Sequence, residues 1–88
     1  MPTVSMFFGV IIRMYFPPKE HNPPHVHASY QGANASFNIG DGTILKGDFP
    51  DRQSKFVTAW IEIHHDELLA DWELCQKGET PFPIDPLR

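Results

Sequence analysis

The residue types that could do chemistry in this sequence gather in one short segment. Three histidines fall within seven residues, at His21, His25 and His27, and Glu20 precedes the first of them. His25 and His27 lie two apart, so on a β-strand their imidazoles share a face, with Cβ atoms about 6–7 Å apart. Three neutral imidazoles and a water form a known zinc arrangement in which the ion activates the water. The segment is therefore a candidate site for zinc or another divalent transition metal.

Such a site needs a general base, and two residues are candidates for it. Glu20 could ligate the ion or take the proton of its water, and His65, in the pair His64-His65, is the second candidate base. Other interpretations stay open, because histidines beside prolines often cap backbone groups or form a pH-sensitive interface. The spacings typical of zinc fingers and zinc proteases are absent, which favours a binding role over a metal. No other cofactor is indicated.

The elements that position the histidines are predicted to be β-strands. Pro17-Pro18 ends the first strand region, and Pro23-Pro24 stiffens the loop before His25. Gly9 allows either a hairpin or a bulge within that first region. Asp41-Gly42 is the strongest hairpin signal and predicts a type I′ turn. The apolar alternation places strands over residues 4–16, 25–30, 33–39 and 43–47.

The period changes to three and four residues after position 50, which predicts an amphipathic helix over 50–78. Asp51 is a plausible N-cap or first-turn anion. At 1.5 Å per residue the helix would span about 39 Å, which leaves room for a kink near His65-Asp66, with Asp66 beginning a second helix. Its outer face is predicted to be acidic and solvated, through Asp66, Glu67, Asp71 and Glu73. Its apolar stripe is formed by Val57, Trp60, Ile61, His64, Leu68, Trp72 and Cys75.

The predicted fold class is α+β, in one domain over residues 1–88. An antiparallel meander of four to five strands (1–49) precedes one long helix (50–78) that packs on one face of the sheet. The proline-containing tail (79–88) is expected to be extended, with Phe82, Ile84 and Leu87 packed back onto the body.

Composition narrows the classes of function. A chain of 88 residues supports one modest core, and a single cysteine, Cys75, excludes an internal disulfide. The net charge of −4 argues against a general nucleic-acid binder, although a local basic patch stays open. That patch would comprise Arg13, Lys19, Lys46 and Arg52. With no targeting signal and an apolar run (6–12) too short to span a membrane, we expect a cytoplasmic protein.

Several of these motifs together resemble the small bacterial family DUF4160, over nearly the whole chain. The resemblance implies a stand-alone bacterial protein of about this length, and some members are linked to toxin–antitoxin or regulatory pairs. It implies no particular activity. The link over 17–20 departs from the pattern, being longer than in many members. The residues that carry the resemblance are those of 1–7, Gly9, 12–16, His21, Pro23-Pro24, His25, His27, Trp60, His64, 66–68, 71–74 and 83–87.

Two classes of function follow. The first is a protein-binding component of a toxin–antitoxin-like or regulatory pair, with a small protein encoded nearby as its partner. A strand edge beside the histidine loop could pair with a strand of that partner. The alternative is a metal-dependent hydrolase or nuclease with His21, His25 and His27 as ligands. A homo-oligomer with these histidines at its interface is a third hypothesis.

Overall fold

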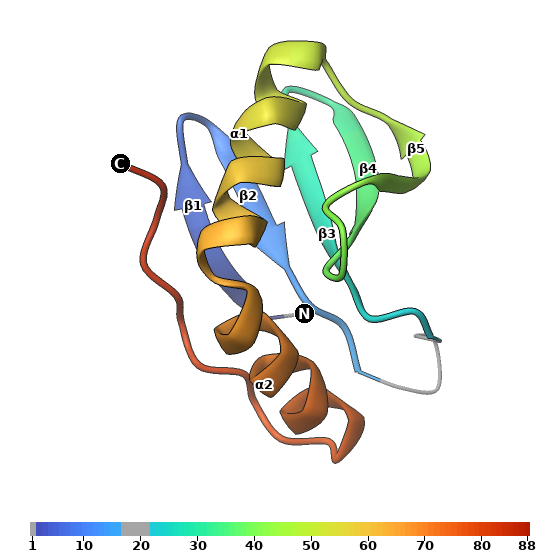
Figure 1. The fold of residues 1–88 in the computed structure, drawn as a ribbon, viewed down its shortest axis with the longest axis vertical. Coiled ribbons are helices and arrows are strands. Elements are labelled where there is room, and N and C mark those ends of the chain that lie inside the picture. The colour runs from blue at the N-terminus through green and yellow to red at the C-terminus, as the bar shows by residue number, and fades with distance from the viewer. Residues whose placement is uncertain (1, 17–21) are drawn as a thin grey trace.

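The computed structural model describes residues 2–16 and 22–88, and their fold is a five-stranded antiparallel sheet followed by two helices (Figure 1). The strands are paired in chain order, β1-β2-β3-β4-β5, so the sheet is a simple meander. The predicted α+β fold is confirmed, with five strands. The elements are β1 (Thr3–Phe7), β2 (Val10–Arg13), β3 (His25–Tyr30), β4 (Ala33–Asn38), β5 (Ile44–Asp48), α1 (Asp51–Ile63) and α2 (His65–Gln76).

Two of the connections are tight hairpins. Phe8 and Gly9 join β1 to β2 with φ angles of 49° and 80°, and Gln31 and Gly32 join β3 to β4 with 44° and 85°. Two successive residues with positive φ give the turn whose twist matches that of paired strands. Of the two alternatives at Gly9, the hairpin is therefore correct.

The predicted type I′ turn at Asp41-Gly42 is wrong. Gly42 has a φ of 76°, but Asp41 does not adopt a positive φ. The Asp41 carboxylate instead accepts hydrogen bonds from the backbone N–H of Thr43, at 3.0 Å, and from its hydroxyl, at 2.7 Å. An aspartate can organise a turn through its side chain in this way, and the sequence pair alone does not distinguish the two solutions.

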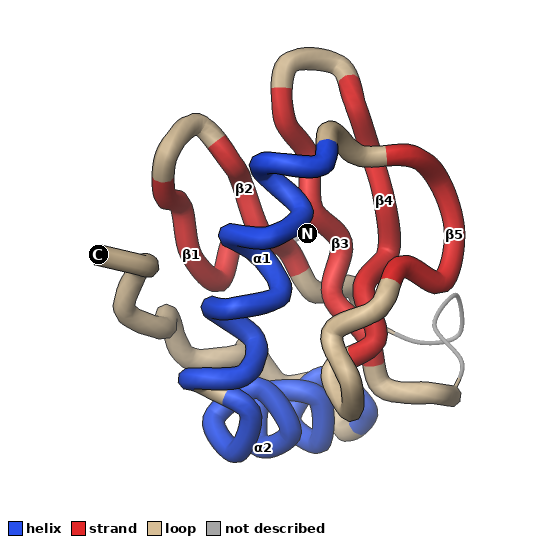
Figure 2. Tube along the Cα trace, turned by 45° about the horizontal axis from the view of Figure 1, so that its top comes forward, coloured by secondary structure: helices blue, strands red, loops and turns tan. Residues whose placement is uncertain are grey.

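The helical region is divided into two helices at His64, one residue before the predicted kink. His64 has φ −108° and ψ 23°, and α2 leaves this point at an angle to α1 (Figure 2). The bend lets two short helices follow the small sheet, where one straight helix would extend past it. The predicted apolar stripe is confirmed: all its members are buried except His64, which is half-buried.

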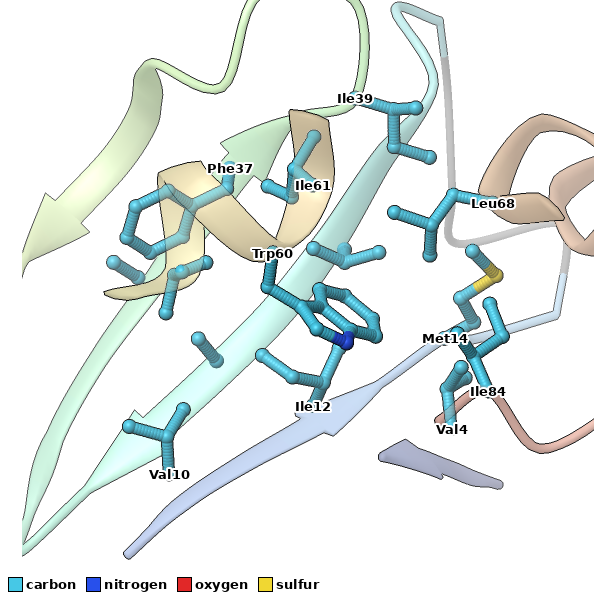
Figure 3. Close-up of a cluster of buried hydrophobic side chains, with 14 of the residues drawn as sticks. Val4, Val10, Ile12, Met14, Phe37, Ile39, Trp60, Ile61, Leu68 and Ile84 are labelled. Carbon is cyan, nitrogen blue, oxygen red and sulfur yellow. The ribbon is translucent and has the colours of Figure 1, made fainter. Parts of the chain in front are cut away.

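The core lies between the helices and one face of the sheet (Figure 3). Ile12, Phe37 and Trp60 are fully buried there, and β2, β3 and β4 each alternate between buried and half-exposed positions. We call the sheet face under the helices the covered face. The opposite, open face carries the alternate positions, including Arg13, His27, Ser36 and Lys46, which are paired across neighbouring strands.

The C-terminal tail runs beside β1 (Figure 1). The Ile84 N–H donates to the Val4 carbonyl at 2.8 Å, and the Trp60 indole donates to the Asp85 carbonyl, also at 2.8 Å. Ile84 is buried and Leu87 partly so, as predicted, but Phe82 is 70% exposed and that prediction is wrong. The backbone N–H of Phe82 is held by Asp71, which leaves the ring in solvent.

Within the described residues, neither helix is long and apolar enough to cross a membrane.

Gly47 is the point of closest approach between β5 and β4. Its φ is 90°, and a Cβ placed there would collide with the carbonyl oxygen of Asn34 and lie 3.1 Å from the Cα of Ala35. Both obstacles are backbone, so no side-chain rotation can relieve them. Gly32 has a similar φ of 85°, but a Cβ there would meet nothing within 4 Å.

These two glycines make a matched pair. We expect Gly47→Ala to lower the free energy of unfolding by about 2–4 kcal/mol, since it combines an unfavourable φ with a backbone clash. Gly32→Ala should cost only about 1–2 kcal/mol, because it carries the φ penalty alone. Urea unfolding of both variants measures the difference, and equal losses would show that β5 can move away from β4.

Candidate functional site

Two of the three histidines of the predicted site, His25 and His27, lie at the beginning of β3. They alternate with the fully buried Val26, so both residues are on the opposite side of the strand from that core side chain. Their ring centroids are 5.1 Å apart, with the planes at 73°. The expectation that these two residues share a face is therefore met.

His27 is held between neighbouring strands. Its ring stacks on Tyr15 with a centroid distance of 4.2 Å and an angle of 22°. On the other side, its Nδ1 lies 3.4 Å from the hydroxyl of Ser36, the residue opposite it on β4. Contacts on both sides fix the orientation of this imidazole.

His25 is oriented by the proline loop. Its Nδ1 lies 2.8 Å from the carbonyl oxygen of Pro23. A carbonyl can only accept, so Nδ1 carries the proton and the lone pair of the neutral ring is on Nε2. The His25 ring also lies 5.1 Å from the ring of Trp72, which brings α2 against the start of β3.

Of the remaining candidates, the structure describes one, His65. Glu20 and His21 lie outside the described residues. His65, the other candidate base, contacts its neighbour Asp66 at 3.1 Å. In the part of the chain that the structure describes, no three His, Cys, Asp or Glu side chains are grouped to hold a metal ion. The three-histidine site thus stays a prediction.

His64 is half-buried and hydrogen-bonded, as its place on the apolar stripe predicts. Its Nδ1 lies 2.6 Å from the Glu67 carboxylate, and its ring centroid is 5.6 Å from that of Trp60. These contacts give His64 a structural role at the helix junction.

The structure also assembles a row of polar residues that the sequence did not show as a set, although Arg13 and Lys46 had been assigned to a possible basic patch. Arg13, His27, Ser36 and Lys46 are successive partners across β2, β3, β4 and β5. A hollow of about 330 Å³ opens along part of this row, with Tyr15, His27, Ser36 and Lys46 in its lining. The alternation of each strand could have indicated the face, but the cross-strand register was needed to find the row.

The hypothetical basic patch is therefore divided. Arg13 and Lys46 belong to one row on the open face, whereas Arg52 is on α1, 6.0 Å from the ring centroid of Phe56. Lys19 lies outside the described residues. Arg13 also donates to the Ser29 hydroxyl at 3.4 Å, which holds its side chain along the sheet.

Asp71 departs most from its predicted role on a solvated helix face, because it is only 2% exposed. Its Oδ1 accepts the Phe82 N–H at 2.9 Å, and its Oδ2 has no hydrogen-bond partner among the described residues. Burial raises its pKa, the charge of Glu67 raises it further, and the Phe82 hydrogen bond opposes both. The pKa of the Cys75 thiol is raised as well, by burial and then by the charge of Asp71, so a buried unreactive thiol is the role that fits.

The fold and this polar face define a small α+β domain, a one-sided antiparallel meander with a candidate binding surface. The family model "Domain of unknown function (DUF4160)" matches residues 9–73, more than half of the chain. The chain belongs to this family, as the sequence motifs predicted. Comparison with curated proteins and with solved structures gives no match.

Asp71 provides a pH-dependent test of how α2 binds the tail. Because its pKa is higher in the folded chain than its ordinary value of 3.8, the folded state binds this proton more tightly than the unfolded state does. The resulting stability is complete below pH 3.8 and is lost as the pH rises through the raised pKa.

Asp71→Asn keeps a neutral oxygen for the Phe82 N–H but cannot titrate. The unfolding free energy of the unmodified chain minus that of the variant should thus be largest at acidic pH and decrease toward neutral pH. Urea unfolding of both proteins over that range measures the difference, in which all other titrating groups cancel. A difference independent of pH would contradict the raised pKa.

Proposed function

We propose that this protein is the protein-binding component of a toxin–antitoxin-like or regulatory pair, and that its partner adds a strand to the edge of the sheet at β5. The observation that carries the proposal is the exposure of β5. It is the last strand of the sheet, and all five of its residues are exposed. Ile44 and Leu45 are 40% and 44% exposed, which places apolar side chains on this edge.

The opposite edge of the sheet is occupied. The C-terminal tail lies alongside β1, and the Ile84 N–H donates a hydrogen bond to the Val4 carbonyl. An exposed edge strand offers a template for another strand, and natural proteins commonly cover such edges. The asymmetry between β1 and β5 favours β5 as the docking edge.

The charge of β5 favours a different protein over a second copy of this chain. Lys46 is the central residue of the strand. Antiparallel self-pairing about that centre would place two lysines directly opposite each other, which destabilises a strand pair. The partner that fits is an extended segment with an acidic residue opposite Lys46 and an apolar residue opposite Ile44.

The family resemblance supports a paired role, since some members are linked to toxin–antitoxin or regulatory pairs. Size is consistent with it: a chain of 88 residues has one modest core, and strand addition needs only an edge and a short apolar contact.

The test is co-expression of the untagged chain with the tagged protein from the adjacent reading frame. We expect the two proteins to co-purify, and Leu45→Lys to reduce the recovered complex by at least about tenfold, since a lysine on an edge strand opposes pairing. Ile63→Lys is the matched control, because Ile63 is 65% exposed on α1, away from β5. Both variants should fold, with changes within about 0.5 kcal/mol.

Three results would contradict the proposal: no co-purification together with no effect of either protein on growth or transcription, equal loss in both variants, or a complex containing only copies of this chain.

A metal-dependent hydrolase or nuclease is the second candidate, and the orientation of His25 favours it. With the Nδ1 proton donated to the Pro23 carbonyl, the imidazole is in the tautomer that presents the Nε2 lone pair. Second-shell carbonyls orient metal-binding histidines in this manner. His21, His25 and His27 would be the ligands, with Glu20 or His65 as general base.

Metal analysis of untagged protein and a zinc titration observed on the imidazole resonances test this candidate. It requires one ion per chain and shifts at His21, His25 and His27, with binding weakened at least about tenfold in His25→Ala, because one of three protein ligands is lost. His64→Ala is the control, since His64 contacts Glu67 at the helix junction. No stoichiometric ion and unchanged resonances would exclude the site.

A further inference from the structure

The row across the open face has the composition of an anion site. Arg13 and Lys46 stand at its ends, with His27 and Ser36 between them. Neighbouring strands are about 4.8 Å apart, so the two ends are separated by about 14 Å at the backbone. Lys46 lines the hollow in the middle of the row, whereas the Arg13 guanidinium donates to Ser29 at 3.4 Å. An arginine side chain is long enough to leave that contact and reach a group seated above Ser36.

Among the described residues, no neighbouring charge cancels these two cations. In the described part of the chain, no carboxylate forms an ion pair with Arg13 or Lys46. The lining of the hollow, as far as the structure describes it, includes no aspartate or glutamate. The nearest acid in the register is Asp48, which is opposite Asn34 in the next row. A basic row in a chain of net charge −4 is a local departure from its composition.

The hollow is of a suitable size and chemistry for a phosphate ester. Its volume of about 330 Å³ is at the lower end of the range for small-molecule sites. The Ser36 hydroxyl can donate to a phosphate oxygen from the floor, and Gly47 contributes only backbone to the wall. The Tyr15 ring, stacked on His27, adds an aromatic surface at the border, where a base could extend the stack.

We propose that the open face binds the phosphate of a nucleotide, seated above Ser36 between the Arg13 guanidinium and the Lys46 ammonium. The same phosphate chemistry is offered by a free mononucleotide and by a single-stranded nucleic acid. The argument for this site does not rest on the protein partner at β5, because it uses the face of the sheet and the partner would use its edge, although Lys46 belongs to both.

The test is a titration of the isotope-labelled full chain, observed on its backbone amide resonances. Three probes are used: inorganic phosphate, adenosine monophosphate, and a single-stranded RNA of about ten nucleotides. We expect saturable shifts at Arg13, Ser36 and Lys46 that weaken with added salt. Tighter binding of the monophosphate than of the RNA, per site, identifies a free nucleotide as the ligand; the reverse identifies a nucleic acid.

Variants separate a specific site from general attraction. Arg13→Gln and Lys46→Gln should each weaken binding by about five- to tenfold, as expected for one charge-assisted contact in a solvated site. Lys55→Gln is the matched control, because Lys55 is an exposed cation on α1. The absence of shifts with all three probes at millimolar concentration, or an equal loss in the control, would overturn the proposal. Thermal unfolding of each variant verifies that it is folded.

Discussion

The contacts of Trp60 are the interaction on which the rest of this small fold depends. The side chain is fully buried in the last turn of α1, and its ring is 5.4 Å from Phe7 at the end of β1. Its indole N–H donates to the Asp85 carbonyl, and its ring contacts His64 at the junction with α2. One residue thus joins the sheet, both helices and the tail. With a single modest core to rely on, such a shared contact is costly to lose.

A second constraint is that both helices pack on the same face of the sheet. The covered face takes the apolar half of each strand, so the open face must carry half-exposed polar residues. This is why the fold could be predicted from sequence. Apolar residues that recur every two positions predicted the strands, and apolar residues that recur every three or four positions, such as Val57, Trp60 and Leu68, predicted the helical region. The two-residue spacing of His25 and His27 predicted that they share a face. The bend at His64 was predicted from length alone, to within one residue.

What sequence could not provide is information about pairing between distant segments. Asp71 is on the side of α2 that meets the tail, so a residue assigned to solvent is buried against Phe82. The same backbone contact exposes the Phe82 ring. The basic row was hidden for a related reason, because Arg13 and Lys46 become neighbours of one site only through the registers of three strand pairs. At Asp41-Gly42, the residues were compatible both with a type I′ turn and with a turn organised by the Asp41 side chain.

The edge and the open face meet at Lys46, and this couples the two proposed binding events. A strand added beside β5 would place one further residue at the end of the Arg13–Lys46 row, adjacent to the proposed phosphate position. An acidic residue opposite Lys46 would pair with its ammonium and reduce the positive charge available to a phosphate. Partner and nucleotide would then each weaken the binding of the other by the same factor, because coupling between two equilibria is reciprocal. Because loss of the Lys46 charge is expected to weaken phosphate binding by about five- to tenfold, a partner strand that pairs with this lysine would lower nucleotide affinity by a factor of that order.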